Sequence, residues 1–268
     1  MNILSVESCS TKYPARLSFT IKNAASLVPI TILLLSKLFK FPSIIFSSIL
    51  KKVVIAITGL SLFLFLIVHL AGNITIFTGN PPGQDFNAYA HFLESFGILF
   101  TVAELGLLAF FLIHITSALY TNYQNYKSRN NRYAVSNFAG GNSKKTYAST
   151  SMVITGIVVM AFLIWHVLQF RFGAYYETIY PGVNGGEPVR DLYRLITEEF
   201  SNIWVVIGYT VSLLLLSLHL GHGFWSSFQS LGIYGKNFTR ITYSISYLLG
   251  TIISVGFLII PIYIFFIN

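Results

Sequence analysis

The chain has 268 residues, of which 54% are hydrophobic and 10% are charged, and it carries a formal net charge of +8. Soluble domains carry about 25% charged residues, so this composition excludes an ordinary soluble enzyme and indicates a membrane protein. The one cysteine, Cys9, excludes a disulfide within the chain.

The first 46 residues are basic and rich in serine, and they hold one short apolar run, LVPITILLL, at 27–35. A helix needs about 20 residues to cross a hydrocarbon core of roughly 30 Å, and this run is shorter and interrupted by Pro29. We therefore expect residues 1–46 to form a basic extension that is cytoplasmic or lies at the membrane interface. Residues 47–268 are expected to form the membrane domain.

Five later stretches are apolar and long enough to cross a membrane. They lie at 53–77, 97–121, 150–170, 202–225 and 241–266. Backbone groups in lipid must be hydrogen-bonded within their own segment, so each stretch is expected to be a helix in contact with the lipid bilayer. The sequence thus predicts an all-α integral membrane protein built as a five-helix transmembrane bundle. Between the first two spans, the amphipathic run FNAYAHFLESFG predicts a short interfacial helix with His91 as a surface residue.

The connections between the spans differ in charge. Fourteen of the 17 Lys and Arg residues lie on one side of the predicted membrane, in the N-terminal tail, the 122–149 loop and the 226–240 loop. The other side holds only Arg171, Arg190 and Arg194. Cytoplasmic loops carry the excess of Lys and Arg, so we expect a cytoplasmic N-terminus and a C-terminus on the opposite side. This distribution explains the positive charge without a nucleic-acid partner.

Four histidines lie deep in four different spans, each about 17 residues, or about 25 Å, from the start of its span. Because alternate spans run in opposite directions, His69 and His166 are expected near the outer membrane face. His114 and His219 are expected near the inner one. A histidine in lipid is costly and usually marks a functional site. Two facing pairs at two depths predict two bis-histidine haems.

The predicted haems are b-type, because the chain has no Cys-x-x-Cys-His motif for covalent attachment. A single membrane histidine can instead donate a hydrogen bond to a neighbouring helix. The alternative, from a different functional class, is therefore a haem-free transporter or assembly protein that uses the histidines as proton relays. His222, three residues after His219, is the chief rival for the inner ligand.

Two charged residues near the predicted outer face are further candidates. Arg171 follows His166 by five residues and could pair with a haem propionate. Glu104 lies inside the second span, ten residues before His114. A carboxyl group at that depth could relay protons or hydrogen-bond a quinone, and an interhelical hydrogen bond explains it equally well.

Several strings resemble one known family. VHLAGN around His69, FLIHITSALY around His114, IWHVLQFR around His166 and SLHLGHGFWSSFQSLG around His219 look like the single-chain, five-helix cytochrome b subunit of succinate:quinone oxidoreductases, which comprise succinate dehydrogenases and fumarate reductases. SSILKKVVIAITGL and SRNNRY fit the same pattern. The resemblance extends from about residue 47 to the C-terminus and leaves the first 45 residues unexplained.

The resemblance implies a bacterial inner-membrane subunit that anchors a flavoprotein and an iron-sulfur protein on the cytoplasmic face. Electrons would pass between those partners and a membrane quinone through two haems b. By motif match, His114 and His219 would ligate the inner haem, and His69 and His166 the outer one. Glu104 matches an acidic position near the outer quinone pocket. The dicarboxylate chemistry would lie on the partners, since this chain has no dinucleotide fingerprint and no cysteine cluster. A cytochrome b subunit of another quinone-linked dehydrogenase remains the alternative within this class.

Overall fold

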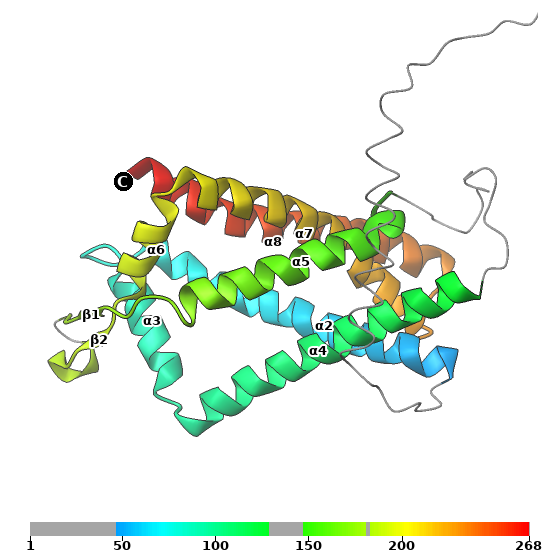
Figure 1. Cartoon of the computed structure of the whole chain (residues 1–268), viewed down its shortest axis with the longest axis horizontal. Coiled ribbons are helices and arrows are strands. Elements are labelled where there is room, and N and C mark those ends of the chain that lie inside the picture. Colours follow the sequence, from blue (N-terminus) through cyan, green and yellow to red (C-terminus); the bar gives the residue numbers. More distant parts are fainter. Residues whose placement is uncertain (1–46, 129–146, 181–182, 268) are drawn as a thin grey trace, which may run out of the picture. The chain divides into compact units, whose positions relative to one another are not determined.

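The computed structural model describes residues 47–128, 147–180 and 183–267, with the side chains of 147 and 148 left out. The predicted N-terminal extension at 1–46 and most of the basic loop, at 129–146, lie outside the described residues. Five long helices dominate the described part (Figure 1). They are α2 (Ser48–Ile74), α4 (Ile98–Lys127), α5 (Tyr147–Phe170), α7 (Ile203–Ser230) and α8 (Lys236–Ile267).

All five are long and apolar enough to cross a membrane, which confirms the predicted class of multi-pass helical membrane protein. Several helices continue beyond the apolar stretches, because polar residues can extend a helix into the membrane interface. Helix α2 begins at Ser48, where the Ser47 hydroxyl accepts a hydrogen bond from Leu50 N at 3.2 Å. The Asn202 side chain caps α7 in the same way, accepting from Trp204 N at 3.0 Å.

The closest helix pair is α7 with α8, which lie side by side in Figure 1. Small residues bring the two backbones together, as is usual in membrane bundles. A Cβ atom on Gly250 would lie 3.0 Å from Gly221 N and 3.1 Å from Ser217 O. The buried Ser246 hydroxyl donates to the Gly221 carbonyl across this contact. This pair therefore forms the most tightly packed part of the bundle.

One end of the bundle is covered by short elements, and we call it the capped end. It holds α3 (Gln84–Glu94), α6 (Leu192–Phe200) and an antiparallel pair of short strands, β1 (Glu177–Thr178) and β2 (Val189–Arg190) (Figure 1). The predicted short helix around His91 corresponds to α3. Helix α6 and the two strands are additional to the elements predicted from the sequence. The capped end is the predicted outer side.

The fully buried Asn87 connects α3 to the start of α6 at the capped end. Its amide nitrogen donates to the Asp191 carboxylate at 2.8 Å, and its amide oxygen accepts from Tyr193 N at 3.0 Å. A buried amide must satisfy its donors and acceptor, so these bonds fix α3 against the start of α6.

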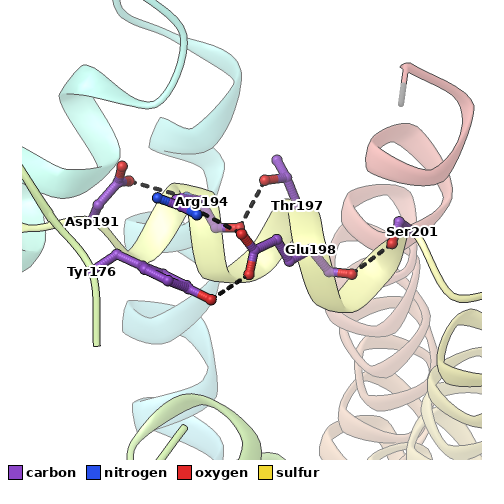
Figure 2. A network of polar contacts seen from close by, with 6 residues as sticks. All are labelled: Tyr176, Asp191, Arg194, Thr197, Glu198 and Ser201. Atoms are coloured by element: carbon purple, nitrogen blue, oxygen red, sulfur yellow. Dashed lines mark hydrogen bonds and ion pairs between the residues drawn. The ribbon is translucent and has the colours of Figure 1, made fainter. Parts of the chain in front are cut away.

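The exposed side of α6 carries the polar network drawn in Figure 2. Asp191 caps the helix by accepting from Arg194 N at 3.0 Å. Tyr176 donates its hydroxyl to Glu198 at 2.6 Å, and Arg194 donates Nε to the same carboxylate at 2.9 Å. Both hydrogen bonds keep the pKa of the Glu198 carboxyl below its ordinary value, and the bond from Tyr176 has the larger effect.

The lowered pKa of Glu198 predicts a pH-dependent contribution to stability. An unfolded glutamate has a pKa of about 4.3, so the contribution should be fully present above that pH and lost as the pH falls through the lower folded-state value. We expect Glu198→Gln to lower the Tm slightly at pH 7 and to have no effect in strong acid. Melting curves of both proteins across this pH range provide the measurement. A difference in Tm that persists unchanged below the folded-state pKa would contradict the assignment.

Candidate functional site

The four membrane histidines come from four different helices, α2, α4, α5 and α7, and the structure brings them together as two pairs. His69 and His166 form the capped-end pair, with ring centres 6.0 Å apart and ring planes 82° apart. His114 and His219 form the opposite-end pair, and they are close enough to interact electrostatically. The two levels match the alternation of helix directions.

Threonines orient both rings of the opposite-end pair. His114 Nδ1 lies 3.1 Å from the Thr58 hydroxyl and 3.1 Å from the Ile55 carbonyl, both on α2. A carbonyl can only accept, so the proton sits on Nδ1. The Thr58 hydroxyl donates to the Val54 carbonyl at 2.7 Å, which leaves its oxygen free to accept from the ring.

His219 has an equivalent partner on α5. Its Nδ1 lies 3.2 Å from the hydroxyl of Thr155, which is buried and donates to the Ser151 carbonyl at 3.2 Å. Because the Thr155 hydroxyl proton is used in the bond to Ser151, the threonine oxygen accepts a hydrogen bond from His219 Nδ1. Each ring of the opposite-end pair is thus turned by a threonine on a neighbouring helix.

A glycine follows each of these threonines and lets the ring approach the helix. A Cβ atom on Gly59 would lie 3.0 Å from His114 Cε1, and one on Gly156 would lie 3.3 Å from His219 Cε1. Such contacts are tighter than ordinary van der Waals distances, so a side chain at either position would push the imidazole out of place.

The two threonine–glycine pairs belong to an internal sequence repeat that α2 and α5 share. The segments 57–69 and 154–166 both begin with Ile-Thr-Gly, share Phe-Leu-Ile further along and end on histidine. Thus α2 and α5 each orient a histidine on the next long helix and carry their own histidine eleven residues after the threonine. This repeat was the available sequence signal for Thr58 and Thr155.

The capped-end pair has different surroundings. His166 Nδ1 lies 3.1 Å from the Tyr209 hydroxyl, which donates to Gln169 Oε1 at 2.9 Å. The His69 ring stacks on Phe65 with centres 5.2 Å apart, and the Asn73 amide nitrogen lies 3.3 Å from His69 Nδ1.

In three of the four histidines, the two ring nitrogens have different surroundings. Nδ1 of His114, His166 and His219 is hydrogen-bonded to protein, whereas within the described ranges no hydrogen bond reaches Nε2 of any of them. An imidazole held by a hydrogen bond at Nδ1 presents a lone pair at Nε2, which is how metal-ligating histidines are commonly oriented.

Two other candidate residues, Glu104 and Arg171, contact each other. Arg171 Nε lies 3.0 Å from Glu104 Oε1, and Nη2 lies 3.2 Å from Oε2, so the ion pair is bidentate. It joins α4 to the end of α5. The propionate contact of Arg171 and the quinone or proton role of Glu104 stay predictions.

His222, the rival ligand, lies one turn from His219. Its ring packs edge-on against Trp225 with centres 5.4 Å apart, and its buried Nδ1 has no hydrogen-bond partner among the described residues. It thus lacks the threonine that orients His114 and His219.

Comparisons with protein families, curated proteins and solved structures found no match for this chain.

Proposed function

We propose that the chain is the membrane-anchor cytochrome b subunit of a succinate:quinone oxidoreductase. It would hold two noncovalent haems b, the capped-end haem between His69 and His166 and the opposite-end haem between His114 and His219. The observation that carries the proposal is the pairing of four histidines at two levels, with Nε2 left free in three of them.

The residues present fit this cofactor. Two imidazoles that bind one metal atom through bonds of about 2.0 Å have ring centres roughly 6 Å apart, and the capped-end pair has a separation of 6.0 Å. At the opposite end, Gly59 and Gly156 leave each ring against a helix backbone without a side chain in between.

Each part of the chain has a task in this proposal. When bound, the two haem irons supply one-electron redox chemistry across the bilayer. Thr58 and Thr155 would bind Nδ1 of the opposite-end imidazoles and leave Nε2 available to the iron, and Tyr209 would do so for His166. The long helices exclude water and anchor the flavoprotein and iron-sulfur partners, on which the dicarboxylate chemistry would take place. A membrane quinone would exchange electrons at the capped end, where Glu104 lies.

The direct test is to purify the protein from its native membrane, count haem per chain and record the reduced-minus-oxidised spectrum. We expect two b-type haems per chain and co-purification of a flavoprotein and an iron-sulfur protein. A colourless chain would overturn the proposal in favour of a haem-free transporter or assembly protein. Two haems with subunits of another dehydrogenase would keep the cytochrome b assignment and reject the succinate partner.

The threonines provide a second prediction. Thr58→Val and Thr155→Val keep the side-chain volume and remove the hydrogen-bond partner of His114 or His219. Partners of ligating histidines are typically worth about 10–100-fold in affinity, so we expect each variant to weaken the opposite-end haem by that order. Haem titration of the apoprotein measures the affinity.

Thr210→Val is the matched control for these variants, because the Thr210 hydroxyl donates only to the Val206 carbonyl of its own helix, at 2.8 Å. It should leave both haems in place. Equal haem affinity in the wild type and in both threonine variants would show that the threonines do not orient ligands.

A further inference from the structure

A row of hydrogen bonds connects His166 in the bundle to a carboxylate on α6. Its members alternate between three helices: His166 and Gln169 lie on α5, Tyr209 on α7 and Glu199 on α6. His166 Nδ1 lies 3.1 Å from the Tyr209 oxygen, and the Tyr209 hydroxyl donates to Gln169 Oε1 at 2.9 Å. Gln169 Nε2 then donates to Glu199 Oε2. We call these four residues the relay row.

The carboxylate at the far end determines the direction of every bond. An ionised carboxylate only accepts, so Gln169 must turn its amide nitrogen towards Glu199 and its oxygen towards Tyr209. The Tyr209 hydroxyl therefore donates its proton to Gln169 Oε1. Its oxygen can then only accept a hydrogen bond from His166. All protons therefore point towards Glu199, and the Nδ1–H tautomer of His166 follows.

The surroundings of the row are largely apolar. Tyr209 is buried, and the rings of Phe162 and Phe200 both pack edge-on against it with centres 4.9 Å away. In such an environment a hydrogen bond to a charged group is stronger than in water, and successive bonds polarise one another. The row therefore connects Glu199 to the imidazole through the buried Tyr209.

None of the three arginines on this side of the described chain forms a salt bridge with Glu199. Arg194 pairs with Glu198, Arg171 pairs with Glu104, and Arg190 donates to the Phe170 carbonyl at 3.0 Å. In the described part of the chain, Glu199 makes no ion pair, and its hydrogen bond to Gln169 is the only one recorded for its side chain.

The opposite-end pair has no counterpart of this row. There, Nδ1 of His114 and His219 meets neutral threonine hydroxyls and, for His114, a backbone carbonyl. The capped-end pair is thus connected to a carboxylate through the relay row, whereas the opposite-end pair meets only neutral groups. The two pairs differ in this way although α2 and α5 share a sequence repeat.

We propose that Glu199, acting through Gln169 and Tyr209, is a tuning residue for His166: it fixes the Nδ1–H tautomer and increases the electron density at Nε2. This inference rests on the proposed function. A more electron-rich imidazole stabilises the oxidised iron over the reduced iron, so the row lowers the reduction potential of the capped-end centre relative to the opposite-end centre.

The first experiment is an optical redox titration of the purified protein. Glu199→Gln removes the charge and keeps an oxygen that can accept from Gln169, and we expect it to raise the potential of one centre and leave the other unchanged. Glu198→Gln removes a neighbouring charge outside the row and should shift neither centre. Equal shifts in the two variants would overturn the proposal, since they would indicate a general surface-charge effect.

Tyr209→Phe separates the row from direct electrostatics. Alone, it should raise the potential of the same centre as Glu199→Gln does. In the Tyr209→Phe background, Glu199→Gln should cause little further shift, because its connection to His166 is broken. A full additional shift would show that Glu199 acts through space and would refute the relay row. The spectrum of the unshifted centre serves as the control for folding in each variant.

A second readout does not depend on haem. Solid-state ¹⁵N NMR of histidine-labelled, reduced protein should show His166 protonated at Nδ1, assigned through its loss in His166→Gln, with a changed Nδ1 shift in Tyr209→Phe. If the chain holds no haem but His166 shows this tautomer and response, the row stands and the proposed function fails. If two haems bind but neither the tautomer signal nor the potential responds, the row fails and the proposed function stands.

Discussion

His219→Ala is expected to abolish one of the two b-type centres and to leave the other with an unchanged spectrum. His114→Ala should remove the same centre, because His114 and His219 form the opposite-end pair and are oriented by equivalent threonines on α2 and α5. An iron with one imidazole missing loses its low-spin bis-histidine coordination, so the effect is a full loss rather than a small shift. Reduced-minus-oxidised spectra at low temperature, with a haem count, measure the outcome.

His69→Ala and His166→Ala should remove the other centre. His222→Ala is the matched control, because it deletes an imidazole one turn from His219 that has no orienting partner among the described residues. Both centres should survive this substitution. Loss of a centre in His222→Ala with retention in His219→Ala would reassign the ligand, and loss of both centres from all four variants would contradict the pairing.

Gly250→Ala is expected to destabilise the bundle at the contact between α7 and α8. The added Cβ would lie 3.0–3.1 Å from backbone atoms of Gly221 and Ser217, and backbone cannot move aside as a side chain can. Overpacking of this kind costs about 1–3 kcal/mol. Because α7 carries both His219 and Tyr209, separation of α7 from α8 should also loosen haem at both levels. Thermal unfolding in detergent, followed at the haem absorbance, measures the change.

Gly223→Ala is the control for this substitution. In the described part of the chain, no atom outside the surrounding helix backbone lies within 4 Å of a Cβ at Gly223, and alanine is about 1 kcal/mol better than glycine in a helix. It should leave the Tm unchanged or raise it. If Gly250→Ala is as stable as Gly223→Ala, close backbone packing between α7 and α8 does not hold the bundle together.

The sequence predicts the large features of this molecule well, because they depend on composition and length. Apolar stretches of sufficient length define the five helices, which the structure contains. The alternation of helix direction is enough to group His69 with His166 and His114 with His219, without knowledge of how any helix is rotated.

Contacts between elements were harder to predict, because they depend on rotation about each helix axis. The bond between Thr155 and His219 joins residues 64 positions apart, and the ion pair of Glu104 with Arg171 joins residues 67 apart. Helix α6 lies in a polar connection whose apolar residues are too few to predict a span, and the bond of its capping residue Asp191 to the buried Asn87 joins residues 104 positions apart. The repeated Ile-Thr-Gly was visible, but its use became clear only from the neighbouring helix.

The most direct test of the central proposal is a density map of the purified protein in detergent or nanodiscs by electron cryo-microscopy. We predict two planar macrocycles, one between His69 and His166 and one between His114 and His219, each with iron bound to two imidazoles. A map that shows the histidine rings well ordered, with side chains or water between them and no macrocycle at either level, would contradict the proposal.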